Sequence, residues 1–232
     1  TTAVTFTRSA PYDHVTKQVT YGAWTPASGS FPAVTSPTIV GYTPSSTSST
    51  AVTVAPGASN NTQTITYNAN DESAKIEYID QTDNNSIIKT DTINGVFGQT
   101  VSYDPTDEIK ALEAKGYQLV SNGVKNNQIT FTNGSNQVYQ IVLKHGTTTE
   151  TPSSNPDNHD LTKTVSRTIN YQYQSGSQAA NPVTNSVTFT RTATKDNVTG
   201  KVTYTAWTST GNAEYPAVTS PTITGYTASQ TQ

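Results

Sequence analysis

Short runs of alternating apolar and polar residues dominate the N-terminal part of the chain, 1–70. Segments 4–8 and 15–21 both alternate valine or aromatic residues with polar ones, and prolines separate the runs. Alternation with a period of two is typical of half-buried strands. Two later segments, 52–54 and 64–67, are expected to form a closing hairpin or a crossover strand. Because the apolar residues here do not follow a helical period, the pattern predicts an all-β region.

The pattern changes after residue 70. A strand is expected over 74–80, and a second over 87–93, ending at Asn94-Gly95, a pair that accepts positive φ. Segment 104–116 then begins with Asp-Pro, carries acidic residues in its first turn and ends in glycine. These are start and stop signals of a short helix, and Ile109 and Leu112 would form its apolar edge.

Three more strands are expected after this helix, over 117–120, 128–131 and 138–143. The resulting order is ββαβββ, with one helix laid across a mixed sheet. This order predicts a β-grasp domain over residues 71–146.

One part of the sequence occurs twice in the chain. The matching pairs are 4–8 with 187–191, Trp24 with Trp207, and 31–39 with 215–223. The offset is constant up to the tryptophans and grows by one after them, because the second copy has an inserted residue in the following loop. Solenoid periods are only about 20–50 residues, so this much longer repeat predicts a tandem array of whole domains. The chain would then cover one period and a duplicated margin.

The predicted fold class is mainly β (α+β), an elongated row of small domains. Residues 1–70 form a β-rich domain, incomplete at its N-terminal side, and 71–146 form the β-grasp domain. Residues 147–160 lack any apolar anchor and are expected to be an extended linker. Residues 161–232 form the second copy of the β-rich domain, incomplete at its C-terminal side. Incomplete domains expose unpaired sheet edges, so we expect strand-exchanged self-association.

Composition narrows the class of function. Only 12% of the residues are charged and the net charge is −3, which leaves no basic stripe for nucleic acid. Cysteine and methionine are absent, which excludes disulfides, thiolate metal sites and cysteine nucleophiles, and favours a bacterial surface over an animal one. Every apolar run is far shorter than the roughly 20 residues that a membrane-spanning helix needs, so membrane insertion is not expected.

Several segments are similar to a known family. Those that resemble the second domain of the mucus-binding repeat of lactobacillus cell-surface adhesins are 164–171, 187–191, Trp207, 215–218 and 225–226. Those that resemble the family's other domain are 75–80, 114–121 and 142–146. The resemblance implies an extracellular, wall-anchored adhesin that binds mucin glycans through many weak contacts, and in some members immunoglobulins.

The resemblance carries no catalytic residues, and the three histidines lack a partner at helical or strand spacing, so we expect no enzyme. Two other functions stay open: an immunoglobulin-binding or other host-protein-binding repeat, and a structural stalk spacer. Retention on mucin separates binding from spacing.

Aromatic residues are the natural sugar contacts. Trp24 and Trp207 occupy equivalent positions among alternating residues, so they are expected in the core of each domain. Tyr42 and Tyr226 each follow a glycine in a predicted loop and are the candidates for glycan binding.

No cofactor is required by this interpretation, although calcium is a candidate ligand. Asp80 and Asp83 lie in a polar loop rich in oxygen ligands. The loop lacks the glycine and the distant glutamate of the helix–loop–helix calcium motif, so a solvated turn is the alternative.

Overall fold

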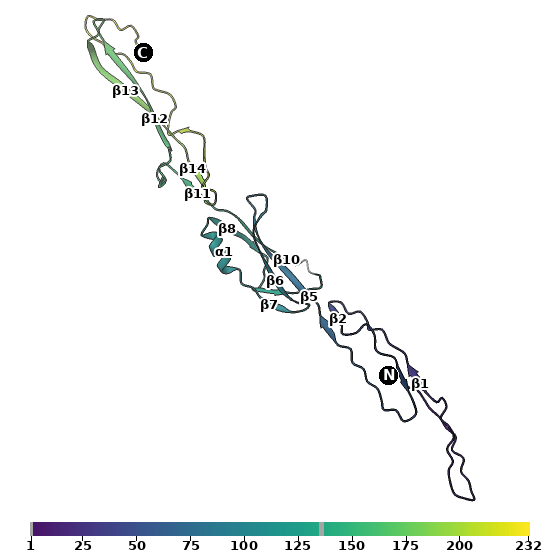
Figure 1. Cartoon of the computed structure of the whole chain (residues 1–232). Coiled ribbons are helices and arrows are strands. Elements are labelled where there is room, and N and C mark those ends of the chain that lie inside the picture. Colours follow the sequence, from purple (N-terminus) through teal and green to yellow (C-terminus); the bar gives the residue numbers. More distant parts are fainter. Residues whose placement is uncertain (1, 135–136) are drawn as a thin grey trace. The chain divides into compact units, whose positions relative to one another are not determined.

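The computed structural model describes residues 2–134 and 137–232, and strands make up nearly all of their regular structure (Figure 1). The elements are β1 (Gly29–Phe31), β2 (Tyr42–Pro44), β3 (Val52–Val54), β4 (Tyr67–Ala69), β5 (Asp71–Asp80), β6 (Ser86–Val96), β7 (Thr100–Ser102), α1 (Thr106–Glu113), β8 (Tyr117–Asn122), β9 (Gln128–Thr130), β10 (Gln137–His145), β11 (Thr147–Glu150), β12 (Thr162–Gln172), β13 (Gln178–Thr190), β14 (Ala193–Asp196), β15 (Val202–Tyr204) and β16 (Thr208–Ser209). The prediction of a mainly β fold with one short helix is confirmed. Within the described ranges, no helix has the length and apolar character needed to cross a membrane.

The first repeat copy, residues 1–70, has fewer strands than its pattern predicts. β1 pairs with β3 and β2 with β4, both antiparallel. The predicted strands over 4–8 and 15–21 are wrong, because these segments make only single bridges, such as that between Thr7 and Thr25. In the second copy, residues 161–232, the equivalent of 4–7 is 187–190, which lies in β13 and pairs along β12. Among the described residues, segment 4–8 makes one bridge, between Thr7 and Thr25, and pairs with no strand comparable to β12.

The central region has the predicted β-grasp elements. One sheet has the strand order β6-β5-β10-β8, and β7 and β9 form a second, two-stranded sheet. The single helix, α1, lies between β7 and β8 in sequence and buries Ile109 and Leu112, as its apolar edge predicts. Gly116 follows the helix with a φ of 98°, which favours glycine, and its N–H donates to the Glu113 carbonyl at 3.0 Å.

The predicted turn at Asn94-Gly95 is wrong. Strand β6 continues through both residues to Val96, and neither has a positive φ. A Cβ atom on Gly95 would overlap the ring of Phe131. The glycine therefore serves a close approach between an aromatic ring and the backbone, and not a turn.

The second copy is built on a long antiparallel hairpin of β12 and β13, which is green in Figure 1. β16 pairs with the end of β13, and β11, β14 and β15 form a separate three-stranded sheet. Strand β11 corrects the expectation of an extended linker over 147–160, because its four residues pair with β14. Backbone pairing can hold a threonine-rich segment in register, so the lack of apolar residues did not prevent a strand.

Contacts divide the chain into two compact units, each with its own buried side chains. The first comprises residues up to 78 with 87–105 and 122–141, and the second comprises 79–86, 106–121 and 142–232. Buried apolar residues of the first unit are Ala74, Ile76, Tyr78, Val124, Ile129, Phe131 and Ile141. Those of the second are Ile79, Ile109, Leu112, Leu143, Leu161, Val187 and Ala193.

The prediction that both tryptophans form the domain cores is wrong. Trp24 is 39% exposed and Trp207 is half-buried. Each ring is covered by an arginine instead: the guanidinium carbons of Arg8 and Arg191 both lie 4.5 Å from the ring centroid of their tryptophan. A guanidinium can stack on an aromatic face and stay hydrated, so the rings are held without full burial.

Candidate functional site

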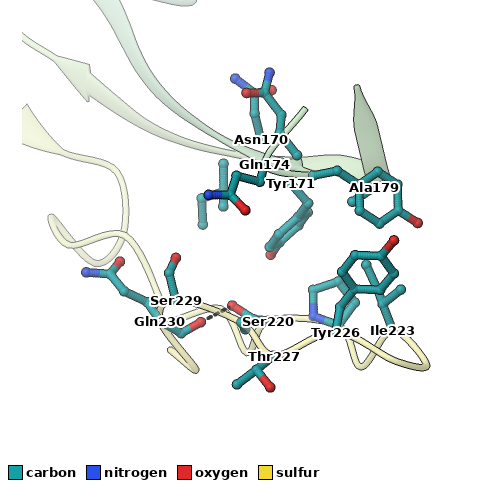
Figure 2. A pocket seen from close by; sticks show the side chains of 15 residues that line it. Asn170, Tyr171, Gln174, Ala179, Ser220, Ile223, Tyr226, Thr227, Ser229 and Gln230 are labelled. Atoms are coloured by element: carbon teal, nitrogen blue, oxygen red, sulfur yellow. Dashed lines mark hydrogen bonds between the residues drawn. The ribbon is translucent and has the colours of Figure 1, made fainter. Parts of the chain in front are cut away.

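The second repeat copy contains a pocket of about 730 Å³. One wall comes from the turn-side end of the β12–β13 hairpin, residues 169–174 and Ala179, and the other from segment 220–230. Figure 2 shows Asn170, Tyr171 and Gln174 on the hairpin side, facing Ser220 and Tyr226 across the opening. The volume is within the range of small-ligand pockets, about 300–1,000 Å³.

Two tyrosine rings pack together at this pocket. The centroids of Tyr173 and Tyr226 lie 4.8 Å apart, with 54° between the ring planes. Tyr226 is presented by a turn in which its N–H donates to the Ile223 carbonyl at 3.0 Å and Gly225 has a φ of 83°. It is 65% exposed, so much of its surface is open to a ligand.

Polar side chains without formal charge surround these rings. The polar lining side chains are Asn170, Gln172, Gln174, Ser220, Thr227, Ser229 and Gln230. Ser220 fixes the second wall, because its hydroxyl donates to the Gln230 carbonyl at 2.7 Å and its N–H donates to the Thr231 carbonyl at 3.0 Å. None of the described lining residues is an acid, a histidine or an amine. The pocket can offer aromatic faces, amides and hydroxyls to a ligand, but no acid–base pair for catalysis.

Tyr42, the equivalent of Tyr226 in the first copy, has a different environment. It lies in β2, is 36% exposed, and its ring packs edge-on against Phe97 with the centroids 5.5 Å apart. The preceding glycine, Gly41, leaves no room for a Cβ atom beside the same phenyl ring. The structure therefore places Tyr226 in a pocket and Tyr42 against a neighbouring ring, and glycan binding at Tyr42 stays a prediction.

The two calcium candidates form a hydrogen-bonded turn. Asp80 is buried, and its Oδ1 accepts the N–H groups of Thr82 and Asp83 at 2.9 and 3.2 Å. Asp83 Oδ2 accepts the hydroxyl of Ser86 at 3.1 Å. Both side chains thus satisfy local donors, as aspartates in turns commonly do, and calcium at this loop stays a prediction.

The other carboxylate oxygen of Asp80, Oδ2, contacts the imidazole ring of His145. The carboxylate of Asp196 contacts the same ring at its other nitrogen. His145 Nε2 lies 2.8 Å from Asp80 Oδ2, and His145 Nδ1 lies 2.6 Å from Asp196 Oδ2. Asp196 repeats the geometry of Asp80, because its Oδ1 accepts the N–H groups of Val198 and Thr199, each at 2.9 Å. We call Asp80, His145 and Asp196 the histidine junction.

Electrostatics favours a charged imidazole in the histidine junction. The hydrogen bond to the Asp196 carboxylate raises the pKa of His145, and burial opposes it more weakly. Backbone N–H groups, first that of Thr199, lower the pKa of Asp196 to about 2. The junction links three segments of the chain through one imidazole ring. Local patterns do not indicate it, because its members come from three distant segments of the chain.

The sequence pattern also does not predict the pocket. The glycine and the loop before Tyr226 single out that ring, but its partners on the hairpin lie much earlier in the chain. The sequence alternates through Val165, Ile169, Tyr171 and Tyr173, which is typical of a strand, and all but Tyr173 lie in β12. It carries no signal that residues 220–230 return beside it.

Comparison with known families separates the chain into two domain types. Residues 1–71 and 156–232 match the Muc B2-like domain, and residues 72–145 match the mucin binding domain. The chain belongs to the family of mucus-binding repeats. This confirms the resemblance predicted from the sequence, and with it the expectation that the chain is not an enzyme.

Two solved structures are similar to this mucus-binding repeat. One, described as the crystal structure of Mub-RV, is 35% identical over 67% of this chain and 84% of its own length, with a TM-score of 0.58. The other is a type 2 repeat of the mucus binding protein MUB from Lactobacillus reuteri, 32% identical over 69% of this chain and 87% of its own length, with a TM-score of 0.44. No curated protein matches the chain.

Proposed function

We propose that this mucus-binding repeat binds mucin glycans, and that the pocket between the β12–β13 hairpin and segment 220–230 is the binding site. The observation that carries the proposal is the packed pair of Tyr173 and Tyr226 in a lining without charged side chains. The match to a mucin binding domain and the solved repeat of a mucus binding protein support the choice of ligand class.

The chemistry of the pocket suits a neutral sugar. Pyranose rings present C–H faces that pack on aromatic rings, and their hydroxyls both donate and accept hydrogen bonds. Tyr226 offers an exposed aromatic face of this kind. Asn170 and Gln174, on the facing wall, each carry an amide that can donate and accept at once. An ionised partner would find no fixed counter-charge in this lining.

A single pocket of this type should bind weakly. Tyr226 is 65% exposed, so a sugar placed on it keeps much of its contact with water and excludes little solvent. Repeated modules overcome weak binding, because attachment at one site raises the effective concentration of ligand at the next. Multivalent attachment is therefore the mode of action that we propose.

The setting of the repeat is part of the same proposal. We propose an extracellular location on a bacterial surface, with wall anchoring in the full-length protein, on the strength of the family match. We propose domains over 1–70, 71–146 and 161–232, and β11 shortens the linker predicted between the last two. Calcium binding and strand-exchanged self-association stay predictions, the latter testable by light scattering.

Immobilised mucin, before and after enzymatic removal of its glycans, tests the proposal, with purified immunoglobulin on a parallel surface. Binding that is lost with the glycans supports the proposal. Binding that survives deglycosylation, or that occurs only on immunoglobulin, contradicts it and favours host-protein capture. Retention on neither surface, with the chain at high density on multivalent beads, favours a stalk spacer.

A further inference from the structure

A second group of polar side chains gathers where β11 ends and the chain loops toward β12. Glu150 is the last residue of β11, and Asp157 and His159 lie in the following loop. One ligand atom from each side chain lies within 4.8 Å of the other two. No residue of this group belongs to the pocket or to the histidine junction.

Two of these atoms are buried without a hydrogen-bond partner. Glu150 is 3% exposed, and within the described part of the chain neither its Oε2 nor His159 Nε2 has a hydrogen-bond partner or measurable solvent contact. The two atoms lie 3.9 Å apart, which is within the distance of an ion pair but too long for a hydrogen bond. A buried polar atom without a partner is costly, so the pair calls for a ligand between them.

The separation suits a metal ion. Zinc lies about 2.0–2.2 Å from a histidine nitrogen or a carboxylate oxygen, so two ligands of one tetrahedral ion are about 3.3–3.5 Å apart. Glu150 Oε2 and His159 Nε2 are 3.9 Å apart, so a small rotation of either side chain would bring them to this separation. Asp157 needs only a small movement, because its carboxylate is exposed and lies in a loop.

The histidine is also oriented as a metal ligand requires. Its other ring nitrogen, Nδ1, lies 3.3 Å from the hydroxyl of Tyr204. Asn155 holds its backbone on both sides, accepting the His159 N–H at 2.8 Å and donating to the His159 carbonyl at 2.7 Å. A partner on the second ring nitrogen fixes the tautomer and directs the first nitrogen at the ion.

The ammonium group of Lys195 lies beside these ligands, and its positive charge would repel a bound metal ion. Its Nζ lies 2.9 Å from Asp157 Oδ2, and the side chain is 40% exposed, so it can turn toward water. One imidazole with two carboxylates is a donor set for zinc and similar ions, whereas calcium and magnesium prefer oxygen alone.

We propose that Glu150, Asp157 and His159 form a three-ligand site for a divalent transition-metal ion of the zinc class. The ion would join the end of β11 to the loop before β12, and its fourth position would be open to water or to a ligand. This site is independent of glycan binding at the pocket.

Calorimetric titration of the whole chain with zinc chloride at pH 7 tests the site. We expect one saturable site per chain, and at least tenfold weaker binding in both Glu150→Gln and His159→Asn. Two variants are matched controls: His14→Asn, which introduces the residue found at the equivalent position 197, and His145→Asn, which removes the imidazole of the histidine junction. Both should keep the affinity of the unmodified chain.

Absence of saturable zinc binding by the unmodified chain overturns the proposal, as does unchanged affinity in His159→Asn. Loss of binding in His145→Asn alone also overturns it, because the ion would then lie in the histidine junction. If Glu150→Gln fails to fold by circular dichroism, the visible spectrum of the cobalt complex decides, since the d–d bands of the bound ion must change in His159→Asn and not in His14→Asn.

Discussion

The guanidinium carbon of Arg191 lies 4.5 Å from the ring centroid of Trp207. Arg8 and Trp24, the equivalent residues of the first repeat copy, have the same separation. The two copies therefore share an arginine-on-tryptophan contact even though their strand pairing differs. This contact explains how exposed tryptophans are held in domains with few buried apolar side chains.

Replacing Arg191 should destabilise the second copy. Its guanidinium also lies 4.0 Å from the Tyr204 ring centroid, and its Nε donates to the Asp160 carbonyl at 2.8 Å. Loss of a cation–π contact and a hydrogen bond is expected to cost about 1–2 kcal/mol in Arg191→Met. Urea unfolding followed by tryptophan fluorescence in a Trp24→Phe background measures this directly, because Trp207 is then the only tryptophan.

The matched variant is Arg8→Met in a Trp207→Phe background. Arg8 stacks on Tyr21 and Trp24, and among the described residues its contacts include no counterpart of the bond from Arg191 to Asp160. Arg8→Met should therefore lower the free energy of unfolding by less than Arg191→Met does, by about 0.5–1 kcal/mol. Equal midpoints for Arg191→Met and its parent would contradict the role given to the contact.

Lys17 and Gly200 are equivalent residues in the two copies, and both have a positive φ, 58° and 72°. Glycine adopts this conformation without penalty, whereas for lysine it costs about 1 kcal/mol or more. Lys17→Gly should therefore raise the thermal midpoint of the first copy, and Gly200→Lys should lower that of the second. Scanning calorimetry of both variants measures the two shifts in thermal midpoint, which should have opposite signs. Shifts of the same sign would contradict the role given to the positive φ.

The histidine junction predicts a pH-dependent stability. The pKa of His145 is raised in the folded state, so its contribution is complete below the unfolded value of about 6.5 and is lost as pH rises through the folded value. The unfolding midpoint should fall over this interval in the unmodified chain, and fall less in His145→Gln. Chemical denaturation from pH 5 to 9 measures the difference.

The titration of Asp196 does not contribute to the change in stability between pH 5 and 9. Its folded pKa is about 2, lowered from 3.8, so its contribution is present above 3.8 and is lost only as pH falls toward 2. His14→Gln is the control, because His14 is exposed and lies outside the junction. A profile for His145→Gln that matches those of His14→Gln and the unmodified chain would show that the junction contributes nothing.

Gly116 should tolerate no side chain. Its φ is 98°, and a Cβ atom would overlap the backbone carbonyl of Asn197. Gly176 has a similar φ of 86° but open space around it, so Gly176→Ala isolates the cost of the backbone conformation, about 1–2 kcal/mol. Gly116→Ala should lower the free energy of unfolding clearly more, and equal losses would mean that the approach of Asn197 is not required.

Local patterns predict the elements whose signals lie within one segment. The Asp-Pro start and the closing glycine locate the helix, and Ile109 and Leu112 are buried as expected. Alternation also locates β12. The repeat offset makes Asp13 and Asp196 equivalent, and each caps a turn by accepting backbone N–H groups.

The pattern fails where the outcome depends on distant residues. Segment 4–8 alternates as its copy in the second repeat does, but within the described ranges it makes only a single bridge. Glycine at position 95 suggests a turn, but the residue lies in a strand where its missing side chain leaves room for the ring of Phe131. The histidine junction and the pocket depend on contacts between segments far apart in sequence, which alternation and spacing do not encode.

The most direct test of glycan binding at the pocket is a map of amide chemical-shift changes in labelled chain on addition of glycans released from mucin. We predict changes confined to residues 169–174 and 220–230, and their loss in Tyr226→Ala. Tyr42→Ala, the equivalent change in the first copy, should leave the changes at residues 169–174 and 220–230 unaltered. Changes that map elsewhere, or that persist in Tyr226→Ala, would contradict the pocket as the binding site.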